Sequence, residues 1–323
     1  MSPPGPDYSK GVPTALRRCD HCGSPDRTLR KCARCSLVSY CSKECQKAAW
    51  PGHKSQCQTV IDWQNGDGIY AEKPTGGRFS GFATMHAFMR AIDDFLKAHA
   101  WAFHNDARAL VASKGGIEWL QSTPPKIITI RLRPSFANTS TQWDRNPATP
   151  FKFVSSSYMT SAEYDDLIAN TAHGWSSEAM TTARINSFRK MQARFGAEFA
   201  GLIPVNITVD GMVFTRFEFF PLRRTRALPP DLEGKEHEIL GDARVLFKQS
   251  VNFGFPLRVS GMDPRYAYPG KFVRAHDHRK WEWTALFEDW AAYDGGNEDL
   301  DATLGKLTSG LSVADVISNV QRL

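Results

Sequence analysis

Long apolar runs and late cysteines are both absent from this chain of 323 residues. No stretch approaches the ~18 uninterrupted apolar residues that a membrane-spanning helix needs, and the N-terminus has no apolar signal-peptide core. We therefore predict a soluble, intracellular protein, nuclear or cytoplasmic, that is not secreted and has no membrane partner. No cysteine follows Cys57, so all seven lie within about forty residues. An odd number of cysteines at paired spacings indicates metal-bound thiolates rather than a disulfide framework.

Common catalytic signatures are absent as well. The sequence has no His-Glu-x-x-His, no Gly-x-Ser-x-Gly elbow, no phosphate-binding Gly-x4-Gly-Lys loop and no strand-linked Gly-x-Gly-x-x-Gly. The best remaining constellation is His276-Asp277-His278 with Glu282, because alternate side chains of a strand share a face and a carboxylate could complete three metal ligands. A helix cap with a solvated turn is the preferred interpretation. An enzyme in the C-terminal part stays an alternative without an assigned catalytic residue.

What the chain does contain is eight potential zinc ligands in four pairs. The pairs are Cys19-x2-Cys22, Cys32-x2-Cys35, Cys41-x3-Cys45 and His53-x3-Cys57. Structural zinc takes four sulfur or imidazole ligands in a closed tetrahedron, so eight ligands saturate two ions and leave no position for water. We expect two structural Zn²⁺ without a catalytic role, and His21, a ninth candidate, is expected not to be a ligand. Spacing alone does not determine which pairs share an ion.

The order of these motifs resembles the MYND zinc finger, with Tyr40 before Cys41, Gln46 after Cys45, and Trp50. The resemblance covers residues 19–57 only. In that family the pairs interleave, which implies two ligand sets: Cys19, Cys22, Cys41 and Cys45 on one ion, and Cys32, Cys35, His53 and Cys57 on the other. Crossed zinc clips replace the hydrophobic core that so short a segment cannot build. Proline is awkward inside a helix, so we expect the first helix to end near Trp50 and a second turn to start at Pro51.

The resemblance also implies a binding function. MYND fingers are docking modules for short proline-containing peptides, which lie as an added strand beside the finger's own strand. The matching elements here are Ser36 to Tyr40 as the strand edge, with Gln46 and Trp50 on the following helix. An indole offers a flat face to proline rings, and an amide can satisfy a peptide carbonyl. We therefore expect an adaptor or transcriptional scaffold that binds peptides through Ser36, Tyr40, Gln46 and Trp50, the alternative being that Trp50 only packs under the finger.

Positive charge is concentrated in the finger. Between residues 10 and 60, ten Lys or Arg face three Asp or Glu, a formal charge of +7 that leaves −1 for the rest of the chain. Zinc-bound thiolates would lower the finger to about +4. Such a patch could contact phosphates, but no helix-turn-helix or C2H2 pattern is present to read bases. A basic DNA-associated regulator is therefore an alternative ranked below peptide binding, and acidic protein partners account for the charge equally well.

MYND fingers also occur inside SET-domain lysine methyltransferases, and three features argue against that activity. Only 18 residues precede Cys19, fewer than the preceding SET segment needs. No Asn-His-Ser-Cys-like cofactor motif follows the finger. With no cysteine after Cys57, the cysteine-rich post-SET zinc site cannot form. We expect a protein that is not a SET-type methyltransferase.

Composition divides the chain into four segments. Residues 1–17 form a Pro/Gly-rich tail, 18–60 the finger, 61–81 a Gly/Pro-rich linker, and 82–323 an α+β domain of unknown function. With 41 % hydrophobic and 23 % charged residues, the chain can bury a core and is not disordered as a whole.

Local patterns predict several elements of this domain. Helical periodicity from Phe82 to about Val111 indicates one long amphipathic helix, with His99 as a buried structural histidine. Asp210-Gly211 between two β-rich runs predicts a hairpin. The remaining expectations are a strand over 126–133, helices over 161–170 and 177–199, a surface loop over 221–237 with Arg223, Arg224 and Arg226 as its solvated rim, a helical stripe over 283–293, and a last helix capped by Ser312.

Overall fold

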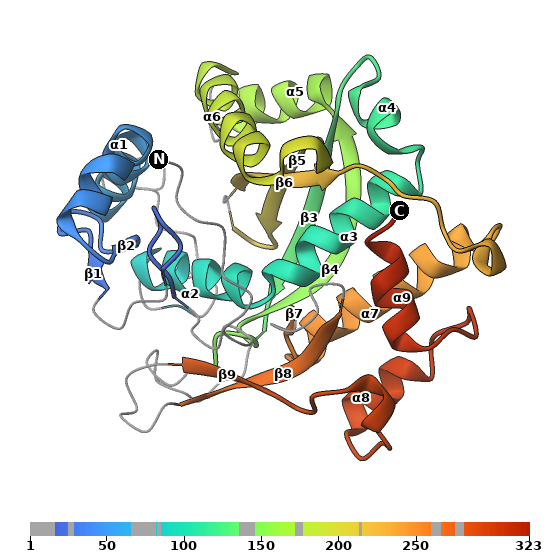
Figure 1. The fold of residues 1–323 in the computed structure, drawn as a ribbon. Coiled ribbons are helices and arrows are strands. Elements are labelled where there is room, and N and C mark those ends of the chain that lie inside the picture. The colour runs from blue at the N-terminus through green and yellow to red at the C-terminus, as the bar shows by residue number, and fades with distance from the viewer. Residues whose placement is uncertain are drawn as a thin grey trace.

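The computed structural model describes residues 17–24, 29–65, 82, 85–135, 146–171, 177–212, 215–259, 266–274 and 281–323. A small finger packs beside a larger domain of mixed helices and sheets (Figure 1). Within the described residues, no helix has both the length and the apolar character to cross a membrane.

The finger consists of one short hairpin and one helix. Strand β1 (Arg30–Lys31) pairs antiparallel with β2 (Ser39–Tyr40), and helix α1 spans Lys43–Asn65. The expected helix end near Trp50 is wrong, because α1 continues through Pro51. The indole of Trp50 and the ring of His53, on either side of Pro51, pack edge-on with centroids 5.9 Å apart. The helix also takes up the first five residues of the expected linker, and 66–81 lie outside the described residues.

The larger domain is built on a four-stranded mixed sheet with the order β4-β3-β5-β6. Its strands are β3 (Lys126–Pro134), β4 (Phe151–Thr160), β5 (Phe199–Val209) and β6 (Thr215–Arg223). Strand β3 pairs antiparallel with β4 and parallel with β5. Strands β5 and β6 form an antiparallel hairpin, and Asp210 and Gly211 lie directly after β5.

Helices cover both faces of this sheet (Figure 1). The main core lies under α2 (Met85–Ala98), α3 (Ala100–Ala112), α7 (Glu236–Phe253) and α9 (Val313–Val320), where alternate residues of β3 such as Ile128 and Ile130 are fully buried. The opposite face packs against α5 (Ser161–Thr171) and α6 (Ser177–Phe195) through a smaller apolar cluster. Alternate residues of each strand therefore point to opposite faces of the sheet, one set into each of the two helical layers.

The predicted long helix over 82–111 is two helices. Helix α2 ends at Ala98 and α3 begins at Ala100, with His99 between them. The ring of His99 is fully buried and its Nε2 lies 2.9 Å from the carbonyl oxygen of Ala148, so it is a structural histidine. Apolar periodicity continues across the break because both helices pack on the same core.

The C-terminal part contains the largest error of the sequence analysis. Residues 283–293, expected as a helical stripe, comprise the end of β9 (Trp281–Ala285) and the 3₁₀ turn η4 (Trp290–Ala292). Strand β9 belongs to a three-stranded antiparallel sheet with β7 (Leu257–Val259) and β8 (Ala267–Arg274). Spaced aromatic residues suit a buried strand as well as a helix, so periodicity alone could not separate the two.

The remaining short elements connect these layers. They are α4 (Gly116–Gln121), η2 (Gly196–Glu198), η3 (Pro230–Leu232) and α8 (Glu298–Leu304). Helix α6 ends at Phe195, four residues earlier than expected, because β5 begins at Phe199. The hydroxyl of Ser312 accepts the backbone N–H of Asp315 at 3.1 Å, which is the N-cap expected for the last helix.

The Gly270 position tests the packing of β8 on β9. A Cβ atom there would lie 2.2 Å from the ring of Trp283, whose Nε1 donates to the carbonyl of Pro256 at 3.0 Å. We expect Gly270→Ala to lower the free energy of unfolding by about 1–3 kcal/mol through overpacking. Gly241→Ala on α7 is the control, because no atom lies within 4 Å of its added Cβ, and it should stay within about 1 kcal/mol of the parent. Urea denaturation measures both, and equal stabilities would contradict this packing.

Candidate metal centres and finger surface

The first donor cluster consists of four cysteine sulfurs. All ligand atoms of Cys19, Cys22, Cys41 and Cys45 lie within 4.8 Å of one another. The Sγ atoms of Cys22 and Cys41 are 3.6 Å apart, and those of Cys41 and Cys45 are 3.5 Å apart. A Zn–S bond of about 2.3 Å gives a tetrahedron with S···S edges of about 3.8 Å. The four sulfurs are therefore spaced as the corners of one zinc tetrahedron.

The second cluster contains three sulfurs and one imidazole, all buried. Its members are Cys32, Cys35, His53 and Cys57, again with every donor atom within 4.8 Å of the others. The Sγ atoms of Cys32 and Cys57 are 3.8 Å apart, and the Cys35 sulfur lies 3.5 Å from His53 Nε2. An edge between sulfur and nitrogen in a zinc tetrahedron is about 3.6 Å, because the Zn–N bond is shorter. These donors fit a second structural Zn²⁺ with no open coordination position.

Tight turns orient the cysteines of a Cys-x2-Cys pair toward one metal site. The N–H of Cys19 donates to the carbonyl of Ser24, and the N–H of Gly23, at φ +76°, donates to the carbonyl of Cys19. Burial alone would raise the pKa of the Cys19 thiol, but backbone N–H groups of Cys22, Cys41 and His21 lower it to about 6. The same backbone groups would stabilise a metal-bound thiolate.

The two clusters cross along the chain, since each takes one pair from 19–35 and one from 41–57. They are the two sets that the resemblance implies. Apart from Tyr40, the fully buried members of the finger's apolar cluster are cysteines. Because the fully buried apolar cluster is this small in the described part of the finger, we expect metal ligation to supply much of the finger's folding energy.

The expected peptide-binding residues differ in what they expose. Gln46 and Trp50 are half-buried, and Ser36 is half-buried at φ 57°. Tyr40 is only 2 % exposed, and its ring packs edge-on against His53, with centroids 6.3 Å apart. The Tyr40 side chain therefore packs beneath the expected peptide-binding surface and cannot contact a partner.

The backbone edge of β2 is closed. The N–H of Ser39 donates to Asp20 Oδ2 at 2.6 Å, and the carbonyl of Ser39 accepts the N–H of Asp20 at 2.9 Å. Tyr40 lies opposite Arg30 in the antiparallel pair, two residues from the hydrogen-bonded pair of Cys32 and Val38, so its backbone groups face β1. An added strand beside Ser39 would have to displace Asp20.

Ion pairs join the finger, and Arg17 directly before it, to the larger domain. The guanidinium of Arg17 donates two hydrogen bonds to Asp94 Oδ1, at 3.1 and 2.7 Å, and one to Asp94 Oδ2 at 2.6 Å. The Nζ of Lys97 lies 3.3 Å from Asp20 and 2.9 Å from Asp93. Asp93 in turn bonds Arg216 of β6 at 3.1 Å.

This network sets the charge states of its members. Burial would raise the pKa of Asp93, but Lys97 and Arg216 lower it. Burial would lower the pKa of Lys97, but Asp93 and Asp20 raise it. Sequence reasoning missed the network, although the i, i+4 spacing of Asp93 and Lys97 on a helix was a visible signal. We call the contact of Arg17 and Asp20 with Asp94 and Lys97 the finger clamp.

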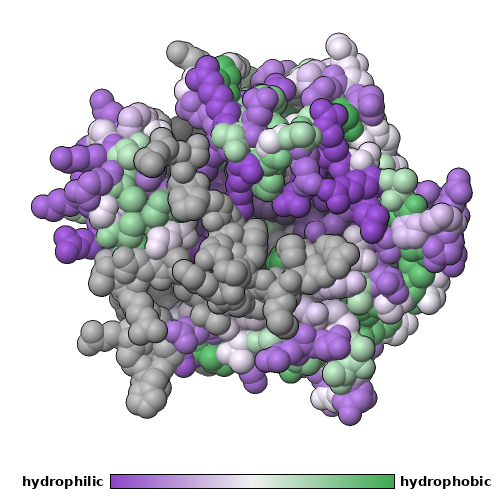
Figure 2. Space-filling view, in the orientation of Figure 1, coloured by the Kyte–Doolittle hydropathy of each residue, from purple (hydrophilic) through white to green (hydrophobic). Residues whose placement is uncertain are grey.

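Exposed cations also surround the finger. Residues Arg30, Lys31, Arg34, Lys43, Lys47 and Lys54 are exposed. Figure 2 shows hydrophilic side chains projecting from the finger at the left edge of the view. The outer face of the finger is therefore basic.

The His276 constellation remains a prediction from the sequence. His276, Asp277 and His278 lie outside the described residues, and Glu282 is exposed on β9.

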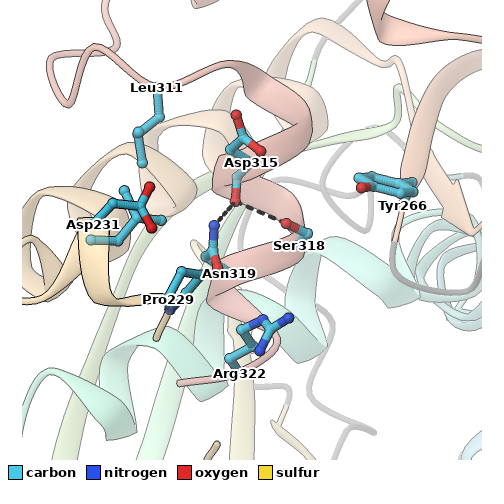
Figure 3. Close-up of a pocket in the computed structure, with 9 residues that line it drawn as sticks. Pro229, Asp231, Tyr266, Leu311, Asp315, Ser318, Asn319 and Arg322 are labelled. Carbon is cyan, nitrogen blue, oxygen red and sulfur yellow. Dashed lines mark hydrogen bonds between the residues drawn. The ribbon is translucent and has the colours of Figure 1, made fainter. Parts of the chain in front are cut away.

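A cleft of about 350 Å³ lies between η3 and α9 (Figure 3). Asp231, Tyr266 and Arg322 line it together with helix residues. The side chains of Ser318 and Asn319 donate to the backbone carbonyl of Asp315, at 3.2 and 2.9 Å, so these donors are used in hydrogen bonds within α9. The lining contains no His or Cys, and the cleft lies far along the chain from the finger.

Comparisons with known proteins match the finger alone. The sequence model of the MYND finger matches residues 19–57. The "SET domain and MYND-type zinc finger protein 6" of Schizosaccharomyces pombe is 43 % identical over 51 residues, 16 % of this chain and 11 % of that protein. Human "Histone-lysine N-methyltransferase SMYD3" is 45 % identical over 42 residues, 13 % of this chain and 10 % of that protein. The "MYND-type zinc finger protein samB" of Aspergillus niger is 43 % identical over 59 residues, 17 % and 9 % of the two chains.

The chain therefore matches only about a tenth of the length of these relatives. No solved structure shows a significant match. Residues 19–57 are a MYND finger, and the comparisons do not recognise the rest of the chain.

Metal content tests the two donor clusters. We expect native mass spectrometry to find two zinc ions in the parent chain and at most one in Cys41→Ser, because a tetrahedron that loses one thiolate is no longer closed. His21→Ala is the control, since His21 lies between two ligands but belongs to neither cluster, and it should keep both ions. A single ion in the parent, or loss of an ion from His21→Ala, would contradict this ligand assignment.

Charge reversal tests the finger clamp. We expect Arg17→Asp or Asp94→Arg to raise hydrogen exchange in α2 about tenfold, because each leaves like charges facing one another across a bidentate contact. The double exchange, Arg17→Asp with Asp94→Arg, should restore protection by rebuilding the pair with reversed polarity. Exchange in α2 that is equally fast in the double variant would show that this pair does not hold the finger.

Proposed function

We propose that the MYND finger of this chain docks proline-containing segments of partner proteins, and that the protein acts as an adaptor or regulatory scaffold. MYND fingers in general mediate protein–protein interactions. The observation that carries the proposal is the position of Trp50, whose indole packs on His53 with one edge and remains partly exposed. A half-exposed indole on a rigid base is suited to pack against proline rings.

Recognition in this proposal relies on side chains rather than on an added strand. Gln46 lies one helical turn before Trp50 on α1, so both side chains lie along one face. The outer backbone groups of Ser39 are occupied by Asp20, and those of Tyr40 face β1, which leaves Ser36 as the contact at the end of the hairpin. Tyr40 contributes by holding His53 and, through it, Trp50.

Charge narrows the class of partner. Lys43 and Lys47 are exposed on α1 within one turn of Gln46 and Trp50. A peptide with acidic residues beside its proline segment would gain electrostatic steering at this face. We therefore include acidic flanks in the proposed ligand.

The organisation of the chain belongs to the same proposal. The two clusters are assigned as the zinc ligands, 18–60 as the finger, and 82–323 as a separate domain whose role is open. A reducing compartment, nuclear or cytoplasmic, is the location in which such thiolate sites persist.

A peptide-selection experiment tests the proposed function. The intact zinc-loaded chain is used to select peptides from a random display library, and the binders are measured by isothermal titration calorimetry. We expect proline to be enriched in the binders, and Trp50→Ala to weaken binding at least tenfold, as loss of an aromatic anchor does. Trp119→Ala is the matched control, because Trp119 is also a half-buried tryptophan but lies on α4 of the larger domain. Binders without proline, or equal losses in the two variants, would refute docking through Trp50.

A further inference from the structure

Helix α6 carries an unusual run of positive charge. No Asp or Glu occurs between Glu178 and Glu198, whereas this stretch contains Arg184, Arg189, Lys190 and Arg194. All four cations are exposed. Lys190 and Arg194 are four residues apart, a like-charge spacing that destabilises a helix. The sequence therefore places mutually repelling charges on one exposed helix, and folding alone gives no reason for them.

The end of β6 adds two cations to the same surface. The guanidinium carbons of Arg194 and Arg223 lie 5.0 and 4.7 Å from the centroid of the same ring, that of Phe195. Arg224 is fixed nearby, because its Nε donates to the carbonyl of Ala197 at 2.9 Å and its N–H donates to the carbonyl of Glu198 at 2.8 Å. Two guanidinium groups held on one aromatic ring leave their remaining N–H groups free for an anion.

We define the α6 basic surface by its exposed cations: Arg184, Arg189, Lys190, Arg194, Arg223 and Arg224. None of the six forms an ion pair with an Asp or Glu in the described part of the chain. Arg226 differs from them, since it is paired with Glu198. Figure 2 shows hydrophilic residues spread over α6 and along the segment that leaves β6. These six cations on α6 and at the end of β6 give this part of the surface a positive charge that suits a polyanion, and the nearby carboxylate of Glu198 is paired with Arg226.

Apolar side chains lie among these cations. Phe188 is 41 % exposed and Ile185 is 44 % exposed, three residues apart on α6. One side of the Phe188 ring packs edge-on against Phe199, with centroids 5.1 Å apart, which fixes its position. An anchored, half-exposed ring beside exposed cations is the arrangement on which unpaired bases stack in proteins that bind single strands.

We propose that the α6 basic surface binds single-stranded nucleic acid, with its cations on the phosphates and Phe188 under a base. Bases in a duplex are stacked on each other and cannot reach Phe188. A membrane is disfavoured because the half-buried apolar residues Met180, Met191 and Phe195 face the protein, where α6 packs on β5 and β6. The site lies on the larger domain and is independent of peptide docking by the finger.

The test uses the full-length, zinc-loaded chain and a fluorescein-labelled 20-nucleotide oligo(U), with anisotropy measured from 50 to 200 mM KCl. We expect the triple variant Arg184→Ala/Arg189→Ala/Lys190→Ala to weaken binding at least tenfold at 50 mM KCl. The slope of log affinity against log salt should become shallower by about 2, because each phosphate contact on a single strand contributes about 0.7. Alanine favours helix, so α6 itself should persist, which circular dichroism checks.

The matched control removes the same charge from the finger. Lys43→Ala/Lys47→Ala/Lys54→Ala changes three exposed cations of α1 and should leave affinity within about twofold of the parent. Equal losses of affinity in the two triple variants would show that only the net charge of the protein matters, which would overturn the proposal. A loss of affinity in the finger variant alone would place the binding site on the finger and would overturn it as well. Failure of the parent chain to bind oligo(U) would also overturn it.

Two further arms separate the possible polyanions. Phe188→Ala should weaken oligo(U) binding several-fold without changing the salt slope, because stacking releases no counterions. A 20-base-pair duplex should bind more weakly than oligo(U) and should be insensitive to Phe188→Ala. Tighter binding to the duplex, or to vesicles containing 30 % phosphatidylserine, would assign the surface to a different partner and refute the single-strand proposal.

Discussion

The carboxylate of Asp20 holds two parts of the molecule together. One oxygen accepts the N–H of Ser39 and the other lies 3.3 Å from the ammonium of Lys97, so the finger hairpin and helix α2 meet at one side chain. Asp20 itself is positioned by its neighbour Cys19, a member of the first donor cluster. Zinc at that cluster therefore fixes more than the finger fold, because the loop that it orders also carries Arg17, the partner of Asp94. The orientation of the finger depends in this way on a metal centre whose ligand Cys19 directly precedes the contact residue Asp20.

The finger and the larger domain are stabilised by different interactions. The larger domain buries a continuous apolar core between a four-stranded sheet and helices α2, α3, α7 and α9. In the described part of the finger the buried apolar cluster consists of Tyr40 and four cysteines, and the stability of the finger is expected to come largely from ligands that must be deprotonated to bind metal. Chelation and acid should therefore act first on the finger, whereas heat and denaturant act on both parts. The finger clamp couples these responses, since its charges lose their partners when the loop around Cys19 is released.

Features set by neighbouring residues could be predicted from the sequence, whereas features set by tertiary packing could not. The four ligand pairs follow from the i, i+3 and i, i+4 spacings of cysteine and histidine, and the hairpin follows from Asp210 and Gly211. The MYND resemblance, rather than spacing, supplied the way in which the pairs interleave. The misplaced elements lie in packed surroundings that the sequence does not show: α1 continues through Pro51 with Trp50 packed on His53, and Trp283 lies in a strand where Gly270 leaves room for its ring. Closure of the β2 edge by Asp20 also had no local signal, because it requires the loop at Asp20 to lie beside Ser39.

The net charge of the larger domain does not show how its charges are distributed. The formal charge outside the finger is −1, yet the charges that sum to it are segregated along the chain. Residues 281–305 contain seven Asp or Glu and no Lys or Arg, whereas residues 179–197 contain four Lys or Arg and no Asp or Glu. Opposite charges that are separated along the chain cancel in the sum but not on the surface, because screening at physiological salt limits each to about 8 Å. The exposed cations of α6 and of the end of β6 thus act as a local positive field on a nearly neutral domain, and a flexible polyanion responds to the local field rather than to the total.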